Sequence, residues 1–149
     1  MTEDEIEVFN DSLTRCLNEP RFLERFYELF LASSPEVRTK FEGTDFRKQR
    51  RTLKASFLLL MLAADGKPEG TRHLEHLAAV HGKTGRDIAP HLYDVWLECL
   101  VRAVRECDSR FTASTERVWR QMLEHGIAFM KARYDDPPVG HAGGAPGSA

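Results

Sequence analysis

The sequence has little cysteine and no recognisable cysteine motif. Its three cysteines, Cys16, Cys99 and Cys107, lack the CxxC spacing that is typical of structural zinc sites and redox pairs. The first residues, Thr2-Glu-Asp-Glu, are acidic and have no apolar core behind them, so we expect no secretory signal. An odd number of thiols without an export signal is typical of a reducing compartment, and we therefore expect a cytoplasmic protein.

The sequence also lacks a long apolar run and a strong net charge. Its longest apolar stretch, residues 57–64, is too short to cross a bilayer, so we expect no membrane partner. The formal net charge is only −2 over 149 residues. Nucleic-acid binding needs a concentrated basic surface, which argues against that partner. We interpret the short basic cluster of Arg47, Lys48, Arg50 and Arg51 as a solvated face.

Alternation of apolar and polar residues is scarce, whereas helical spacing of apolar residues recurs throughout the chain. The pattern predicts an all-α fold of about seven helices, near residues 2–18, 20–33, 35–41, 45–64, 71–81, 90–104 and 112–134. We expect Thr71 to cap the fifth helix and Gly82 to end it in the left-handed conformation. Residues 1–136 then form one domain, and the Gly-, Pro- and Ala-rich residues 137–149 are predicted to be a disordered tail.

His81 is the most informative single residue. It follows Leu74, Leu77 and Ala78 on one face of the predicted fifth helix, so an imidazole stands at the end of an apolar stripe. Histidine is a common metal ligand and holds iron in several classes of haem protein. The pattern alone also suits a packed histidine with no ligand.

Gln49 is the second unusual residue. It shares a stripe of the long fourth helix with Leu53 and Phe57 and is the only uncharged polar residue on that stripe. A buried amide without a partner costs about 1–3 kcal/mol, so Gln49 needs either a local hydrogen bond or a polar ligand. Solvation at the helix edge is the alternative for Gln49, as a packed core position is for Tyr27.

Several segments together resemble the globin domain of bacterial flavohaemoglobins. Residues 25–30 (Arg-Phe-Tyr-Glu-Leu-Phe), Phe41 six residues after Pro35, and residues 48–53 (Lys-Gln-Arg-Arg-Thr-Leu) resemble its distal half, where gas binds. Residues 77–81, residues 90–93 and Trp119 resemble its proximal half, which carries the iron ligand. The resemblance covers about residues 4–134. It departs from the family by two extra residues between His81 and Tyr93.

The resemblance implies a globin fold that binds haem b, with His81 as the iron ligand. It implies that Phe41 wedges the haem and that Tyr27, Gln49 and Leu53 face the bound gas. The residues expected to contact the cofactor are Phe41, Leu53, Phe57, Leu77, Ile88, Tyr93 and Leu97.

Four other histidines compete for the iron, namely His73, His76, His91 and His125. No histidine precedes His73, so the long fourth helix cannot supply a distal histidine.

The implied function is binding of oxygen and other diatomic gases, nitric oxide and carbon monoxide among them. Nitric oxide dioxygenation would need an external reductase, because nothing in the sequence resembles the reductase domain of flavohaemoglobins. Tyr134 stands where that family has a glutamate of the proximal network, which puts peroxidase-like activity in doubt. The alternatives are a haem-based sensor of oxygen or redox state that acts on a protein partner, and a haem-free interaction domain. Surface helices could also pair two chains in a homodimer.

Overall fold

The computed structural model describes residues 1–137 and contains seven α-helices and no strand within that part of the chain. This confirms the predicted all-α class. The predicted disordered tail falls almost entirely on residues 138–149, which lie outside the described residues. The helices are α1 (Glu3–Asn18), α2 (Phe22–Ser33), α3 (Pro35–Lys40), α4 (Phe46–Ala64), α5 (Pro68–His81), α6 (His91–Cys107) and α7 (Ala113–Ala132).

Most helix starts follow from local capping chemistry. Thr2 and Thr112 form capping boxes at α1 and α7, while the Ser34 and Asp45 side chains accept backbone N–H groups at α3 and α4. Helices α2, α5 and α6 have no side-chain cap, and α5 begins at Pro68 and not near Thr71. Proline suits the first turn of a helix, where its missing N–H would have no partner, so α5 starts one turn earlier than predicted.

The end of α5 also differs from the prediction. Gly82 is extended, with φ −64° and ψ 174°, and is not in the left-handed conformation. The left-handed residue is Asp87, with φ 54°, in the loop that follows. Asparagine and aspartate tolerate this conformation better than other non-glycine residues. The reversal of the chain after α5 therefore occurs five residues later than the sequence suggested.

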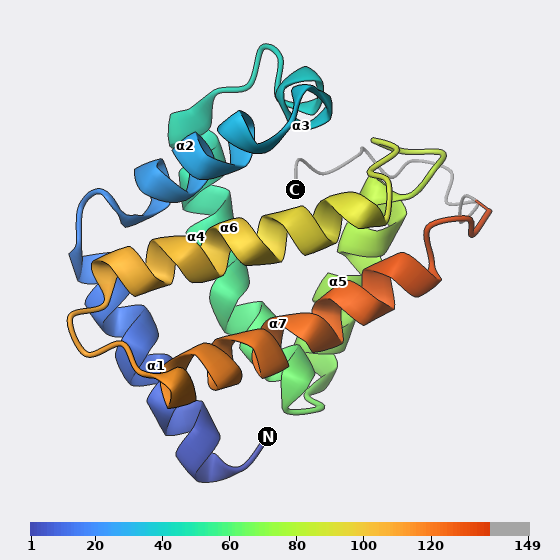
Figure 1. The fold of residues 1–149 in the computed structure, drawn as a ribbon. Helices are drawn as coiled ribbons and strands as arrows, with labels where there is room; N and C mark the ends of the chain where they lie inside the picture. Colours follow the sequence, from blue (N-terminus) through green and yellow to red (C-terminus); the bar gives the residue numbers. More distant parts are fainter. Residues whose placement is uncertain (138–149) are drawn as a thin grey trace.

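The helices cross one another in two main layers (Figure 1). In this view α6 and α7 run roughly side by side in front of α4, while α5 lies behind the far end of α7. Helix α4 packs against α5 and α7, and α2 packs against α6. Close approach of α4 and α5 requires Gly70, because a Cβ atom there would collide with the backbone of Ala63.

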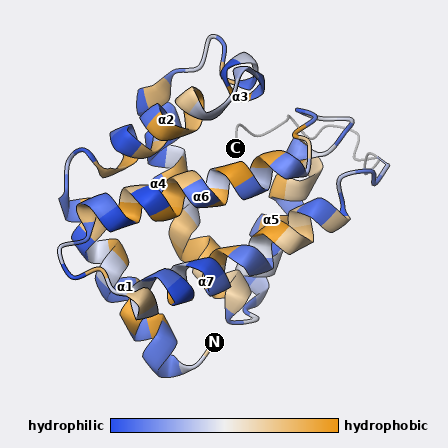
Figure 2. Ribbon diagram, viewed as in Figure 1, coloured by the Kyte–Doolittle hydropathy of each residue, from blue (hydrophilic) through white to orange (hydrophobic). Residues whose placement is uncertain are grey.

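The core lies where apolar faces of different helices meet, and Figure 2 shows apolar stripes on helices that are polar elsewhere. Trp119 of α7 is fully buried at its centre, with Phe9 of α1 and Phe57 of α4 at ring-centroid distances of 4.7 and 5.8 Å. Both ring pairs are edge-to-face, a favoured geometry for aromatic side chains. This cluster fixes α1, α4 and α7 relative to one another.

One buried polar network ties the start of the chain to its end. The Ser12 hydroxyl donates to Asp108 at 2.6 Å and accepts from Trp119 Nε1 at 2.8 Å. Arg15 forms an ion pair with the same carboxylate, whose side chain is fully buried. Every polar group of the network has a partner, as buried polar groups require. Among the described residues, no helix has the length and apolar character needed to cross a membrane.

Candidate functional site

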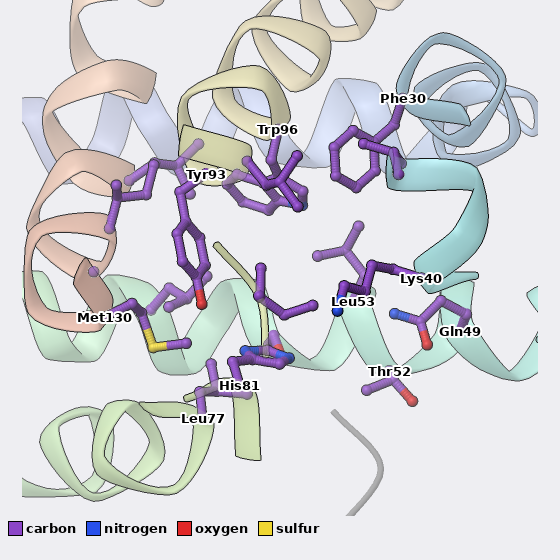
Figure 3. A pocket seen from close by; sticks show the side chains of 18 of the residues that line it. Phe30, Lys40, Gln49, Thr52, Leu53, Leu77, His81, Tyr93, Trp96 and Met130 are labelled. Atoms are coloured by element: carbon purple, nitrogen blue, oxygen red, sulfur yellow. The ribbon is translucent and has the colours of Figure 1, made fainter. Parts of the chain in front are cut away.

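A cavity of about 170 Å³ lies between α2, α4, α5, α6 and α7, and its lining is mostly apolar. Figure 3 shows Tyr93 and Met130 on one side of this cavity, Lys40 and Gln49 on the other, and His81 and Leu77 below. An apolar cavity with a few polar groups is typical of a cofactor or small-ligand site.

His81 is the last residue of α5 and lines the cavity. Its Nδ1 atom is buried and has no hydrogen-bond partner in the described part of the chain. Burial, together with the positive charge of Arg86 and the nearby His76 and His73, lowers the pKa of His81 to about 4. The imidazole is therefore neutral at physiological pH, and a neutral imidazole is the form that binds a metal.

The loop after His81 is held by hydrogen bonds from two directions. Ile88 N–H donates to the carbonyl of His81 at 2.9 Å, which closes the loop onto the end of α5. From the C-terminal side, Tyr134 donates its hydroxyl to the Asp87 carboxylate and accepts a backbone bond from Lys83 at 2.9 Å. Tyr134 thus contacts this loop. The hydroxyl of Tyr93, in contrast, has no hydrogen-bond partner in the described residues. Figure 3 shows the Tyr93 hydroxyl directed toward the His81 side of the cavity.

Tyr27 of α2 lies on another wall of the cavity and is only 5% exposed. Its ring packs edge-to-face against Phe26, Phe41 and Phe46, with centroids 4.8–5.9 Å apart. Burial raises the pKa of Tyr27 to about 12, with the nearby Gln49 acting in the opposite direction. The phenol is therefore protonated at physiological pH and can donate a hydrogen bond.

The structure brings most of the predicted site residues together around the cavity. Those that line it are Tyr27, Phe41, Gln49, Leu53, Leu77, His81, Ile88 and Tyr93. Phe57 and Leu97, which we also expected to contact the cofactor, do not line it. Phe57 packs under Trp119 in the core, and Leu97 belongs to the same core cluster. Sequence spacing placed both residues on the correct helices, but it does not distinguish a residue in the cavity wall from a residue in the core directly behind that wall.

Other residues that line the cavity were not predicted from the sequence. Among them are Thr52, Ser56, Trp96 and Met130, which have ordinary helical positions and carry no local signal. Lys40 is the informative one, because its Nζ atom donates to the carbonyl of Arg86 at 3.1 Å and so reaches the loop after α5. Its place directly before Phe41 was the available signal.

The expected competitors of His81 lie elsewhere. His73 is hydrogen-bonded to Ser56 at 3.2 Å, and His91 is exposed and paired with Glu36 at 3.1 Å. His76 and His125 are exposed. None of the four lines the cavity. His81 is therefore the one histidine of the described residues placed to ligate a metal there.

The geometry defines an all-helical protein with one histidine facing an apolar cavity, and comparisons with known proteins identify the class. The Globin family model matches residues 24–130, so the chain belongs to the globin family. The chain is also similar to a protein from Pseudomonas aeruginosa PAO1 whose crystal structure is presented as structurally highly homologous to a human haemoglobin. The identity is 38%, the match covers 87% of this chain and 98% of the other, and the TM-score is 0.83. A search of curated proteins gives no match.

The site fits the cofactor that the family implies, which is haem. His81 offers a single neutral donor, so a metal held there must bring its remaining ligands with it, as haem iron does. The apolar side chains of Phe41, Leu53 and Leu77 suit a porphyrin, and the buried Nδ1 atom of His81 has no hydrogen-bond partner among the described residues. The chain is a haem-binding globin.

Proposed function

We propose that this globin binds haem b through His81 and uses it to bind oxygen and other diatomic gases reversibly. The observation that carries the proposal is the neutral, unpartnered imidazole of His81 in the same cavity as Tyr27 and Gln49. Haem bound in this cavity supplies a redox-active iron with a coordination position open to a small gas. The residues of the chain decide how strongly a gas is held there.

His81 provides the iron ligand, and its buried surroundings keep the imidazole neutral. Because its pKa is lowered to about 4, no proton has to leave the ring before it binds metal at neutral pH. The bond from Ile88 N–H to the His81 carbonyl and the contact of Tyr134 with Asp87 position the loop beside the ring. Lys40, the cationic lining residue that reaches this loop, would pair with a haem carboxylate.

Tyr27 and Gln49 provide hydrogen-bond donors toward the gas. The Tyr27 phenol keeps its proton because its pKa is raised to about 12, and Gln49 carries an amide N–H. Hydrogen-bond donors in an apolar cavity interact strongly with a ligand that gains negative charge. Each such bond contributes about 1.5–3 kcal/mol, so the protein should release oxygen slowly.

The proposal extends to nitric oxide. Oxygen, nitric oxide and one electron together give nitrate, so turnover requires an external reductase to supply the electron. We expect nitrate from the haem-loaded protein when oxygen, nitric oxide and a reductase are supplied. Without sustained nitrate production under these conditions, gas binding or sensing would remain as the role of the site, and nitric oxide dioxygenation would be wrong.

The test compares the absorption spectra of the full-length protein with those of His81→Ala and His91→Ala. The spectra are recorded in the ferric, ferrous and ferrous carbon monoxide states. We expect a Soret band that sharpens with carbon monoxide in the original protein and is lost or restructured in His81→Ala. His91→Ala is the matched control, because His91 is exposed and outside the cavity, and it should leave the spectra unchanged.

Two outcomes would overturn the proposal. If reconstituted protein does not bind haem, the cavity has another use. If His81→Ala has the spectra of the original protein while one of the other histidines is required, haem binding is correct and the ligand assignment is wrong. Added imidazole separates loss of the ligand from loss of the fold, because it should restore the spectrum of a folded His81→Ala protein.

A further inference from the structure

A second hollow, of about 250 Å³, lies on the outer side of α4, away from the haem cavity. Its lining consists of Leu17, Glu19, Pro20, Phe22, Leu23, Arg47, Arg50, Arg51 and Lys54. The four basic residues come from α4, and the others from the end of α1, the start of α2 and the turn between them. We refer to this site as the basic hollow.

The basic hollow and the haem cavity use opposite faces of α4. At 100° per residue, Arg47, Arg51 and Lys54 point away from the face that carries Gln49 and Leu53, while Arg50 lies at the edge between the two faces. None of these cations lines the haem cavity. The interpretation of the cluster as a plain solvated face is incomplete, because Arg47, Arg50 and Arg51 surround a hollow with an apolar floor.

The positive charges of the basic hollow have no partners. None of its four cations lies within ion-pair distance of a carboxylate in the described part of the chain, although α1, α2, α6 and α7 carry many paired arginines. Helix α4 contains no acidic residue between Phe46 and Ala64. Glu19 is the single acid of the lining and forms no ion pair with these cations.

The spacing of these cations lowers the stability of α4. Arg47 with Arg51, and Arg50 with Lys54, are like-charged pairs four residues apart. Such pairs are neighbours on a helix surface and destabilise it. They also lie in the first turns of α4, where the helix dipole already favours negative charge. An anion bound in the basic hollow would offset both effects.

The floor of the basic hollow is apolar, which favours a ligand that has an apolar part. Phe22 is 1% exposed and anchors the floor, while Leu17 and Leu23 are half-buried beside it. A small inorganic anion would satisfy the arginines and leave this floor in contact with water. An organic anion with a short chain would cover the floor and place its charged group among the guanidinium groups, which bind carboxylates in a bidentate way.

We propose that the basic hollow is a binding site for a small amphiphilic organic anion, a carboxylate with a short apolar chain. The site is separate from the haem cavity, and the proposal does not depend on gas binding. Recognition has two parts, which are charge pairing with Arg50 and Arg51 and contact of the chain with Leu17 and Leu23.

The test uses calorimetric titration of the full-length, haem-loaded protein with octanoate. Acetate supplies the charge without the chain, and octanol supplies the chain without the charge. We expect octanoate to bind clearly more tightly than either. The double variant Arg50→Gln/Arg51→Gln should weaken octanoate binding about tenfold or more, since charge-assisted bonds are the stronger class of hydrogen bond. The matched control is Lys48→Gln, which removes a cation of the same helix that does not line the basic hollow.

Three outcomes would overturn the proposal. Equal binding by acetate would show an anion site without apolar selection, and unchanged octanoate binding in the double variant would place the ligand elsewhere. Tighter binding of an acidic peptide than of octanoate, lost in the double variant, would instead show a docking site for a protein partner. The Soret band is followed in parallel, because octanoate in the haem cavity would alter it and octanoate in the basic hollow should not.

Discussion

The two sides of the haem cavity are built in different ways. Tyr27 lies in the middle of α2 and Gln49 near the start of α4, so both are within helices, and an aromatic cluster packs around Tyr27. On the side of His81 the key residue is the last of its helix, and a loop follows immediately. That loop is held by Tyr134, which lies 47 positions after its partner Asp87 in the sequence.

The difference shows which parts of the site depend on local structure. A residue inside a helix is placed by the helix itself, so the gas-binding donors depend mainly on the packing of whole helices. The position of a residue at a helix end depends on the conformation of the chain that follows it. We therefore expect the His81 side to respond to changes in pH and in loop contacts, and the other side to respond to changes in the core.

The largest effect should come from removing the support behind the gas-binding side. Phe57 is fully buried against Trp119, so Phe57→Ala should lower the free energy of unfolding by about 3–5 kcal/mol. Leu58 is the next residue on the same helix but is 56% exposed. Leu58→Ala should change stability by less than about 0.5 kcal/mol. Urea unfolding of both variants tests this, and similar effects would contradict the buried position of Phe57.

The second effect is a loss of folding stability at acidic pH that comes from His81. In the haem-free protein, His81 has a pKa of about 4 when folded against an ordinary value of 6.5, so the unfolded chain binds its proton first as the pH falls. Stability from this group is complete above about pH 6.5 and decreases as the pH falls toward 4, by roughly 3 kcal/mol in total.

The measurement is urea unfolding of the haem-free protein and of His81→Phe between pH 4 and 7. Carboxylates with lowered pKa values, such as Glu98 and Glu116, also lose stability in acid, so the informative quantity is the difference between the two proteins. That difference should change between pH 6.5 and 4. A difference that is constant with pH would show that His81 titrates normally in the folded chain.

The third effect concerns the gas. Tyr27→Phe removes one hydrogen-bond donor of about 1.5–3 kcal/mol, so oxygen should leave the haem-loaded protein roughly 10- to 100-fold faster. Tyr93→Phe removes a hydroxyl on the His81 side and should change this rate much less. Stopped-flow displacement of oxygen by carbon monoxide measures both rates. Equal rates in Tyr27→Phe and the original protein would remove Tyr27 from the proposed role.

The smallest effect should come from the loop contact. Tyr134→Phe deletes the hydrogen bond to Asp87 and keeps the ring, so we expect only a small loss of stability, because this bond is exposed to solvent. Haem should also dissociate faster, because the loop beside His81 is held less firmly. Transfer of haem to an acceptor protein measures this rate, and Arg133→Ala is the control at the neighbouring position. No change in haem loss for Tyr134→Phe would show that the other loop bonds suffice.

The helices themselves could be predicted because their signals are local. Apolar spacing, capping residues such as Thr2 and Asp45, and prolines near helix starts depend on residues within one or two turns. Helix α6 runs beyond its predicted end, to Cys107. The two other main differences, the start of α5 at Pro68 and the extended conformation of Gly82, flank α5, where local signals conflicted. Thr71 and Gly82 each suited a cap, but packing of α5 against α4 at Gly70 set the helix position instead.

The site could be predicted where a residue type was unusual for its surroundings. His81 and Gln49 were polar residues on apolar stripes, and both line the cavity. Phe57 and Leu97 had the expected character but lie in the core and do not line the cavity, and an apolar residue in the wall and one in the core have the same spacing. The one signal for Lys40 was its place directly before Phe41, and the loop contact of Tyr134 carried no local signal at all.

The sequence by itself determined the helical class, the position of the single well-placed histidine, and the two polar residues that accompany it. These features follow from the periodicity of a helix and from the cost of burying polar groups, which depend on neighbours in the chain. Only the tertiary structure decided which apolar residues surround the cavity, how the loop after His81 is held, and that the cations of α4 surround a separate hollow. Each of these depends on the distances between helices, and those distances are set by packing between residues far apart in the sequence.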